Sequence, residues 1–575
     1  MKLSEALGIL NSMRRRQAPP FRCFLAAGFN SLHLNTFLGA ELTRILPDNT
    51  IQIDQGIYGD LIENLRRLSA SDPDAAVVLV EWTDLDPRLG VRSTAAWSRT
   101  TCADIISNAE HKVVEIQNLV EQASQRTTIA VSLPTLPLPP VSFVPGWQTS
   151  SFEARLREVI HVLAAQLSMR PQVRLLGSQR LDLLLPTWER HDVVSELRTG
   201  FPYRMPHASI LGSLLATLIQ RPSPKKAIIT DLDDTLWRGL LGEVGVEGIS
   251  WDLDHQSQMH AFYQRVLGAL SSEGVLIGIA SKNEQSVVEA ALRRQDLALP
   301  TSGIFPVEAN WGPKSESVRR ALEIWNIGPD ALVFVDDSPL ELAEVKSVFP
   351  DAECLQFPTM DDEAIYRLAW NLRDLFGKVT ISEEDLIRVE SIRRSHGDGD
   401  SPDDAMCDQT EFLKQAQSEV SFQFSQDCRD QRALDLVNKT NQFNLNGARY
   451  TDAAWSKYFQ DPRAFLMVAS YKDKYGPLGK VAVIAGIKVE SKLRIDTWVM
   501  SCRAFSRQIE HRCIEELFSR FQIDQIEFTF RETSKNKPMQ SFLQRVLGQS
   551  PTPACRLVRA ASTTNELYQL ANNNI

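Results

Sequence analysis

Three carboxylates follow one short apolar segment near the middle of the chain. In AIITDLDDTLWRG, residues 227–239, the residues Asp231, Asp233 and Asp234 come directly after a run that predicts a buried strand. Carboxylates packed this closely repel one another unless a cation lies between them, and hard oxygen ligands suit Mg²⁺. One carboxylate can then attack a phosphoryl group while a second exchanges a proton with the leaving oxygen. The alternative is an acidic turn that only caps the following helix.

Later segments supply the other groups that phosphoryl transfer needs. Ser281 ends the apolar run of VLIGIASKN and can donate to a phosphoryl oxygen. Lys314 begins a predicted helix in NWGPKSESV, where its ammonium and the helix dipole both neutralise a phosphate. In ALVFVDDSPLELAEV, Asp336 and Asp337 lie beyond another predicted strand. Because functional groups of an open parallel sheet gather at the carboxyl ends of its strands, we expect these side chains to share one pocket.

The elements that must position these groups alternate between strands and helices from residue 227 to about 377. Such alternation predicts a doubly wound domain with a parallel sheet. The predicted strands are 227–230, 275–280, 331–335 and 353–357, and the predicted helices are 256–271, 285–294, 314–324 and 340–347.

The ordered set DLDDT, Ser, Lys and DD closely resembles the motifs of the haloacid-dehalogenase phosphotransferase superfamily. The resemblance implies a Mg²⁺-dependent enzyme in which Asp231 is the aspartyl nucleophile and Asp233 the general acid and base. The implied residues are Asp231, Asp233, Ser281 and Lys314 for catalysis, Asp231, Asp233, Asp336 and Asp337 for the metal, and Asn283 for substrate. Family members that enclose small substrates insert a cap domain between the motifs, whereas the segments between these motifs are short here. We therefore expect an open, capless site that can accept a group presented on a protein.

The extension TDLDDTLWRGLLGEVGVEGI, residues 230–249, resembles the FkbH-like subgroup. In that family the phosphatase-like domain is joined to an acyltransferase-like domain and works with acyl carrier proteins. The resemblance implies that a small phosphorylated three-carbon acid, such as 1,3-bisphosphoglycerate, is dephosphorylated. Its glyceryl unit would pass to the phosphopantetheine arm of an acyl carrier protein in polyketide or related biosynthesis. Asp234 stands where the subgroup usually has Asn, and we expect it to be a turn residue.

Residues 411–575 predict a mixed α+β domain that resembles the acetyltransferase fold of the GNAT type. The predicted strands are 463–471, 480–488, 492–500 and 524–530, and the predicted helices are 507–520 and 536–547. Acyl-CoA users have a glycine-rich turn where this chain has Arg503, Ser506 and Gln508, so ordinary acetyl-CoA chemistry is not favoured.

Cys502 is the cysteine whose position best suits chemistry. It lies at a predicted strand end beside Arg503, where a thiolate is favoured and can carry an acyl group as a thioester. The alternative is a buried, inert cysteine. Nearby amides can hold the acyl group or the pantetheine arm, or can serve only as turn and helix-end groups. The predicted substrate-binding residues of this domain are Asn441, Gln442, Asn444, Arg503 and Asn536.

Residues 1–222 predict another parallel α/β domain, with strands at 21–27, 75–80 and 127–133. The segment LAAGFNSLHL resembles the start of an SGNH-hydrolase, or flavodoxin-like, doubly wound domain. Ser31 is the candidate nucleophile and His207 its candidate base, although the usual Gly-Asp-Ser is replaced by Phe-Asn-Ser. The alternative is a degenerate domain that binds or docks without catalysis.

Composition sets the broader limits. A chain of 575 residues with 43% hydrophobic content is too long for one core, so we predict domains at 1–222, 223–380 and 411–575, with a flexible connection at 381–410. The net charge of −10 is spread along the chain and favours neither a nucleic-acid nor a membrane partner. The cysteines are scattered and no apolar run approaches a membrane span, which favours a cytoplasmic protein with reduced thiols.

Two other functions remain open from the sequence. One is a plain phosphatase or acyl modifier in surface-polysaccharide synthesis, where similar proteins also occur. The other is a non-catalytic scaffold that docks a carrier protein and keeps only the phosphatase fold.

Overall fold

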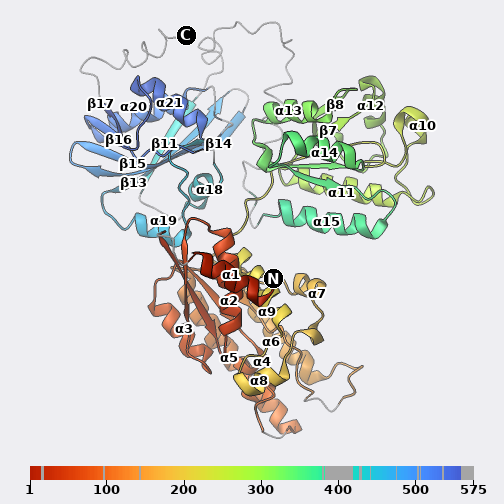
Figure 1. Cartoon of the computed structure of the whole chain (residues 1–575), viewed down its shortest axis with the longest axis vertical. Coiled ribbons are helices and arrows are strands. Elements are labelled where there is room, and N and C mark those ends of the chain that lie inside the picture. The colour runs from red at the N-terminus through yellow and green to blue at the C-terminus, as the bar shows by residue number, and fades with distance from the viewer. Residues whose placement is uncertain are drawn as a thin grey trace. The chain divides into compact units, whose positions relative to one another are not determined.

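The computed structural model describes most of the chain. The described residues are 1–13, 18–94, 97–140, 144–378, 381, 419–425, 430–440, 442–473, 476–501, 504, 507–533 and 536–558. The chain divides into two compact units, one of residues 1–222 with 450–458 and one of residues 223–449 with 459–575 (Figure 1). The connection predicted at 381–410 lies outside the described residues, apart from residue 381.

The first unit is built on a five-stranded parallel sheet in the order β2-β1-β3-β4-β5. The strands are β1 Pro20–Ala27, β2 Thr50–Gln55, β3 Ala75–Leu79, β4 Thr128–Ser132 and β5 Val173–Leu175. The predicted strands 21–27, 75–80 and 127–133 are confirmed as β1, β3 and β4. Strand β2 escaped prediction because it is a partly exposed edge strand, and β5 because it has only three residues.

Helices cover both faces of this sheet (Figure 1). The main ones are α1 Leu3–Met13, α2 Leu32–Ile45, α3 Leu61–Ala70, α5 Arg99–Ser124, α6 Ser151–Ser168 and α9 Met205–Ile219. Shorter ones are α4 Trp82–Leu85, η1 Pro87–Leu89, α7 Ser178–Leu184, η2 Thr187–Glu189 and α8 Val193–Thr199. Helices α1, α2 and α9 share one hydrophobic cluster with the sheet, and α3, α5 and α6 share the other. Both faces of β3 and β4 are therefore buried, which explains their uninterrupted apolar sequences.

The second unit contains a five-stranded parallel sheet in the order β10-β9-β6-β7-β8. The strands are β6 Ala227–Thr230, β7 Leu276–Ser281, β8 Ile304–Ala309, β9 Leu332–Asp336 and β10 Glu353–Gln356. The helices are α10 Leu241–Gly248, α11 Gln258–Ser272, α12 Gln285–Leu292, α13 Lys314–Trp325, α14 Pro339–Val348 and α15 Asp362–Phe376, with η3 Thr301–Gly303 and η4 Pro329–Ala331. The doubly wound pattern predicted for this region is confirmed (Figure 1).

Two features of this sheet bear on the site. Strand β8 was missed because Pro306 lies within it, and the sheet tolerates that proline because β8 is an edge strand. Between β6 and β7, all residues are described, and the only helices there are α10 and α11. The segment between the first two motifs thus contains no inserted domain.

The second unit also holds a mixed sheet in the order β11-β13-β14-β15-β16-β17, with β12 pairing with β15. The strands are β11 Glu419–Ser425, β12 Phe443–Asn444, β13 Ala464–Asp473, β14 Gly476–Val489, β15 Lys492–Met500, β16 Gln525–Phe528 and β17 Cys555–Val558. Strands β15 and β16 are parallel, and the other pairs are antiparallel. The predicted strands and helices are present, and the domain is α+β as expected.

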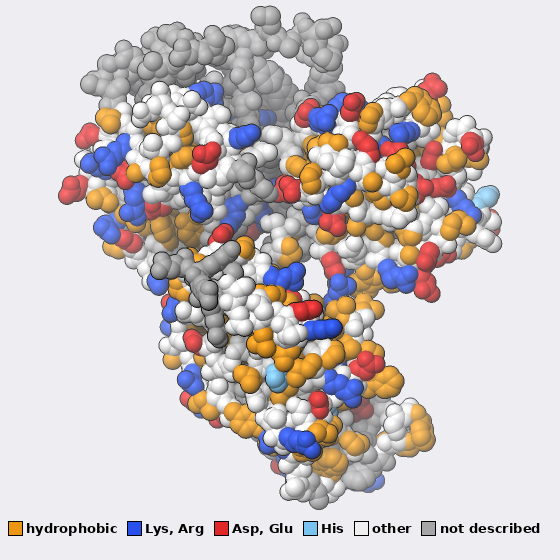
Figure 2. All heavy atoms as spheres, viewed as in Figure 1, with side chains coloured by type: hydrophobic (Ala, Val, Ile, Leu, Met, Phe, Trp, Pro, Cys, Tyr) orange, Lys and Arg blue, Asp and Glu red, His pale blue; other side chains and the backbone are white. Residues whose placement is uncertain are grey.

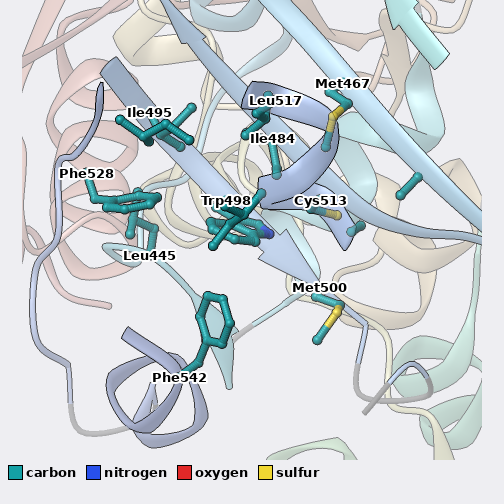
Figure 3. Packing of buried hydrophobic residues seen from close by; sticks show 14 of the residues in the cluster. Leu445, Met467, Ile484, Ile495, Trp498, Met500, Cys513, Leu517, Phe528 and Phe542 are labelled. Atoms are coloured by element: carbon teal, nitrogen blue, oxygen red, sulfur yellow. The ribbon is translucent and has the colours of Figure 1, made fainter. Parts of the chain in front are cut away.

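The core of this mixed sheet centres on Trp498 of β15 (Figure 3). Its ring meets the ring of Phe542 edge-on at 5.4 Å, which fixes α21 Lys537–Leu547 against the sheet. Helix α20 Ile509–Phe521 contributes Cys513 and Leu517 to the same cluster. The remaining helix of the second unit's described part is α18 Gln431–Lys439, while α19 Asp452–Tyr458 belongs to the first unit.

On the face drawn in Figure 2, basic and acidic side chains are interspersed. Five described cysteines, Cys23, Cys102, Cys354, Cys513 and Cys555, are free thiols. Among the helices of the described ranges, none is both long enough and apolar enough to cross a bilayer.

Candidate phosphoryl-transfer site

Three neighbouring strands of the parallel sheet bring polar groups to one edge. Asp231 is the first residue after β6, Ser281 ends β7 and Asp336 ends β9. Because β9, β6 and β7 are adjacent and parallel, their carboxyl ends meet there. Lys314, the first residue of α13, reaches the same place, and all four side chains are buried. The sequence expectation that these residues share one pocket is consistent with this geometry.

One buried ammonium lies between two buried carboxylates. The Nζ of Lys314 lies 2.6 Å from Asp336 Oδ2 and 3.0 Å from Asp231 Oδ2. Burial alone would lower the pKa of Lys314, but the two carboxylates outweigh it and the pKa is raised. Burial raises the pKa of Asp231 to about 7, with Lys314 opposing the rise and Asp336 adding to it. Burial also raises the pKa of Asp336. The site therefore holds more negative charge than Lys314 alone can neutralise.

The carboxylates can hold a metal ion. Asp231, Asp336 and Asp337 each place one oxygen within 4.8 Å of the other two. The buried Oδ1 of Asp231 has no hydrogen-bond partner among the described residues, and a bound cation would satisfy it. Burial, followed by the neighbouring Asp336, raises the pKa of Asp337. Three oxygen ligands with like charge suit a hard divalent cation, so the residues present fit Mg²⁺.

The carboxylate of Asp233 is not part of this cluster, and the prediction that Asp233 is a metal ligand stays a prediction. Its Oδ1 accepts hydrogen bonds of 3.1 Å from Trp237 Nε1 and from the backbone N–H of Leu241. Its Oδ2 accepts one of 2.9 Å from Asn283 Nδ2, which also lies 3.1 Å from Ser281 Oγ. The loop after β6 places the carboxylate within reach of these donors. Three donors thus fix the Asp233 carboxylate, and its role in proton transfer stays a prediction.

The third carboxylate of the opening motif shapes the loop. Asp234 has a φ of +49°, in the left-handed region that Asp tolerates better than most residues. Its Oδ1 accepts a hydrogen bond of 2.9 Å from the N–H of Gly239, whose φ is +104°. Its backbone carbonyl accepts one from the Thr359 hydroxyl, in the loop after β10. The prediction that Asp234 is a turn residue is confirmed.

Sequence reasoning missed the part that Trp237 plays. Its indole is fully buried and donates to Asp233 four residues earlier. The sequence signal was present, because a buried indole N–H needs an acceptor and the nearest carboxylates belong to this motif. The short separation in sequence did not predict which of these carboxylates the Trp237 indole would contact.

The structure describes only some of the predicted site residues of the C-terminal domain. Cys502, Arg503 and Asn441 lie outside the described residues. Asn444 is buried, donates to Thr440 O and accepts from two backbone N–H groups. Asn536 is also buried, donates to two carbonyls and accepts from Thr533 N and Gln540.

The hydrogen-bonding groups of the Asn444 and Asn536 amides are thus already satisfied by protein partners. This does not support the expectation that they hold substrate. The physical reason is that Asn444 ends β12 and Asn536 precedes α21, where each amide satisfies backbone groups at the end of an element. Gln442 is partly exposed, and its role stays a prediction.

The structure does not bring Ser31 and His207 together as a catalytic pair. Ser31 is buried just before α2, and no hydrogen bond joins it to a histidine among the described residues. His207 Nε2 lies 3.0 Å from the hydroxyl of Thr135, which donates its own proton to Glu81. Burial lowers the pKa of His207 to about 3. His207 is thus engaged with Thr135 and not with Ser31, so the structure gives no support to a Ser31–His207 pair and is consistent with the non-catalytic alternative for this domain.

Comparisons with known proteins identify a similar fold. No protein-family model matches the chain, and no curated protein matches it. Among solved structures, it is similar to the N-terminal part of the protein BF1531 from Bacteroides fragilis, which contains a phosphatase domain and was crystallised in complex with Mg. The sequences are 18% identical, the TM-score is 0.52, and the match covers 66% of this chain and 100% of that chain. At this identity the similarity shows the fold, a mixed α/β architecture with parallel sheets.

Proposed function

We propose that this chain is a Mg²⁺-dependent phosphatase of the haloacid-dehalogenase type, with Asp231 as its nucleophile. The observation that carries the proposal is the buried Asp231, whose Oδ1 lacks a partner among the described residues while Lys314 lies 3.0 Å from Oδ2. A nucleophile in this position needs a cation on one side and an ammonium on the other. The Mg bound to the phosphatase domain of the similar structure supports the same assignment.

The chemistry divides among the described side chains. Asp231 attacks phosphorus, the bond from phosphorus to the leaving oxygen breaks, and Asp233 gives that oxygen its proton. Water then attacks the aspartyl phosphate, Asp233 takes its proton, and inorganic phosphate leaves with Asp231 restored. Lys314 and Ser281 stabilise the phosphoryl oxygens. Mg²⁺ held by Asp231, Asp336 and Asp337 supplies neutralisation of the phosphoryl charge.

Hydrolysis of p-nitrophenyl phosphate by the full chain tests this proposal. We expect activity that requires Mg²⁺, disappears with a chelator, and is lost in Asp231→Asn. Asp351→Asn, in the exposed turn before β10, is the matched control and should retain full activity. Activity that persists in Asp231→Asn, or that ignores Mg²⁺, contradicts the proposal.

The finer proposal is an FkbH-like glyceryl transfer. The phosphopantetheine thiol of an acyl carrier protein attacks the acyl carbon of 1,3-bisphosphoglycerate and loses its proton, the acyl-phosphate bond breaks, and inorganic phosphate leaves. The remaining phosphate ester is hydrolysed at Asp231. Support comes from the sequence resemblance and from the lack of an inserted domain between β6 and β7, which leaves the site accessible to a group on a carrier. Such a transfer would serve polyketide or related biosynthesis.

Mass spectrometry of a phosphopantetheinylated carrier, incubated with enzyme, donor and Mg²⁺, tests the transfer. A glyceryl thioester on the carrier is the expected product, and Cys502→Ser tests whether that thiol carries the acyl group. Phosphatase activity without any loaded carrier would favour the plain phosphatase of surface-polysaccharide synthesis. A function in the producing cell that survives Asp231→Asn would favour the non-catalytic docking scaffold.

A further inference from the structure

The first unit contains a cavity of about 680 Å³ at the carboxyl edge of its own parallel sheet. It is lined by segments that follow three strands: residues 28–29 after β1, 81–85 after β3 and 136–140 after β4. In the order β2-β1-β3-β4-β5, the chain leaves β1 toward one edge of the sheet and continues from β3 toward the other. Strands β1 and β3 thus form the topological switch point, where the connecting loops diverge and open sheets bind ligands. We call this space the switch-point cavity.

One carboxylate of the switch-point cavity, that of Asp84, has an oxygen that is available to a ligand. Asp84 Oδ2 accepts a hydrogen bond of 2.7 Å from the backbone N–H of Glu81, which fixes the side chain. The other oxygen, Oδ1, lies against Gly28, where a Cβ would come within 1.8 Å of it. No donor among the described residues reaches Oδ1. The glycine after β1 therefore makes room for a carboxylate oxygen that is left for a ligand.

The neighbouring Glu81 is already satisfied. Its carboxylate accepts from the Thr135 hydroxyl at 2.7 Å and from the Tyr203 hydroxyl at 2.8 Å. The backbone N–H groups of Thr135 and Leu136 donate to it as well. Glu81 thus ties the loop after β3 to the loop after β4, and its role is to hold Asp84 in place.

The rest of the lining sets the kind of ligand. Much of the wall is apolar and comes from Phe29, Leu61, Trp82, Leu85, Leu89 and Leu136. The charged lining residues are the acids Asp60, Glu81, Asp84 and Glu196 and the bases Arg92 and Lys112, together with His191.

The two bases each have a partner, because Arg92 donates to the Tyr58 hydroxyl and Lys112 lies 3.3 Å from Glu115. His191 Nε2 is likewise engaged, 2.5 Å from Glu196. The open oxygen of Asp84 and the excess of acids both disfavour an anion.

We propose that the switch-point cavity is a second ligand site, which binds a small organic molecule with an apolar body and a protonated amine or a hydroxyl group that donates to Asp84. The volume lies in the range of ordinary small-molecule sites, and the few polar groups orient a ligand whose body packs on the apolar wall. The site takes the opposite charge from the phosphoryl site and does not depend on it.

A matched series of head groups on one chain tests the class of ligand. Octylamine, octanol and octanoate are titrated separately into the full chain by isothermal calorimetry at pH 8, below micelle-forming concentrations. Burial raises the pKa of Asp84 to about 7, so the carboxylate is mostly ionised at this pH. We expect saturable binding of one octylamine, weaker binding of octanol, and binding of octanoate at least ten-fold weaker than that of octylamine.

Variants then locate the binding. Asp84→Asn keeps the shape and should reduce the preference for octylamine over octanol at least ten-fold. Gly28→Ala should weaken all binding, because the new Cβ displaces Asp84 Oδ1. Asp48→Asn, an exposed acid outside the cavity, is the control and should change nothing.

Equal binding of octanoate and octylamine, absence of saturable binding, or an unchanged preference in a folded Asp84→Asn protein would each overturn the proposal. The head-group series on the unaltered chain supports or overturns it even if a variant fails to fold. Because every readout is binding and not phosphate release, the result is independent of the proposed phosphatase activity.

Discussion

Lys314 donates a hydrogen bond of 2.6 Å to the buried carboxylate of Asp336. The same ammonium lies 3.0 Å from Asp231, so a single cation is counter-ion to two buried acids. Lys314 comes from the start of α13, whereas the acids come from the ends of β6 and β9. The ion cluster therefore joins the reactive edge of the sheet to the helix that follows β8, and its loss should affect both stability and chemistry.

Replacing Lys314 by Met should abolish most phosphatase activity and weaken the fold. The activity should fall by roughly 10²–10³-fold, because the ammonium that stabilises the phosphoryl oxygens is lost. Two buried carboxylates lose their counter-ion as well, which costs about 3–5 kcal/mol of unfolding free energy. Urea unfolding and p-nitrophenyl phosphate hydrolysis measure the two effects. Lys472→Met, at an exposed surface ion pair, is the control, and equal behaviour of the two variants would contradict this account.

Replacing Asp337 by Asn should weaken metal binding more than catalysis at saturating metal. Asp337 contributes one of the three carboxylate oxygens but makes no ion pair with Lys314. The Mg²⁺ concentration for half-maximal activity should rise by about ten-fold or more, because one charged ligand is lost. Activity measured against Mg²⁺ concentration gives the shift. Asp351→Asn should leave the curve in place, and a curve that is also unmoved in Asp337→Asn would remove this residue from the metal site.

Replacing Asn283 by Leu should reduce turnover without changing the need for Mg²⁺. The Asn283 amide lies 2.9 Å from Asp233 and 3.1 Å from Ser281, and among the described residues it donates no hydrogen bond to the three clustered carboxylates. The kcat should fall by roughly 10–100-fold, because the proton-transferring group loses one of its three fixed donors. Steady-state kinetics at several Mg²⁺ concentrations separate kcat from the Mg²⁺ requirement. A changed Mg²⁺ requirement with normal kcat would show that Asn283 acts through the metal instead.

Replacing Asn536 by Ala should destabilise the C-terminal part and should not act as the loss of a substrate contact. The amide donates to the carbonyls of Asn444 and Arg531, at 3.0 and 2.9 Å, in a fully buried place. Leaving those carbonyls without donors costs on the order of 2–4 kcal/mol. Urea unfolding followed by tryptophan fluorescence should report the loss, whereas Gln442→Ala, at a partly exposed position, should leave stability unchanged. Normal stability of Asn536→Ala would return this residue to the substrate-binding candidates.

Local pattern was enough to find the groups that lie at strand ends. Asp231 and Asp336 were predictable because each follows or ends an apolar run that is buried on both faces of a parallel sheet. The orientation of Asp233 was not, because it depends on Asn283, which is distant in sequence and adjacent only after β6 and β7 pair. Edge strands with exposed or proline-containing sequences, such as β8, also lack the apolar signature on which such predictions rest.

His207 should make a destabilising contribution to the first unit in acid. Burial lowers the pKa of this imidazole from 6.5 to about 3, so between those values the unfolded chain binds a proton that the folded chain does not. His207 therefore lowers the unfolding free energy as pH drops below 6.5, by about 1.4 kcal/mol per pH unit from this group alone. Asp84 and Glu81 contribute with the opposite sign, because burial raises the pKa of each in the folded unit. In His207→Gln, whose amide can still donate to Thr135, this contribution should be lost, so the variant should become more stable relative to the original chain as pH falls. Hydrogen exchange of peptides from α9, corrected for intrinsic rates between pH 4 and 7, measures the slope, and His255→Gln at an exposed site is the control. Parallel pH profiles for the original chain and His207→Gln would mean that the acid sensitivity of this unit has another origin.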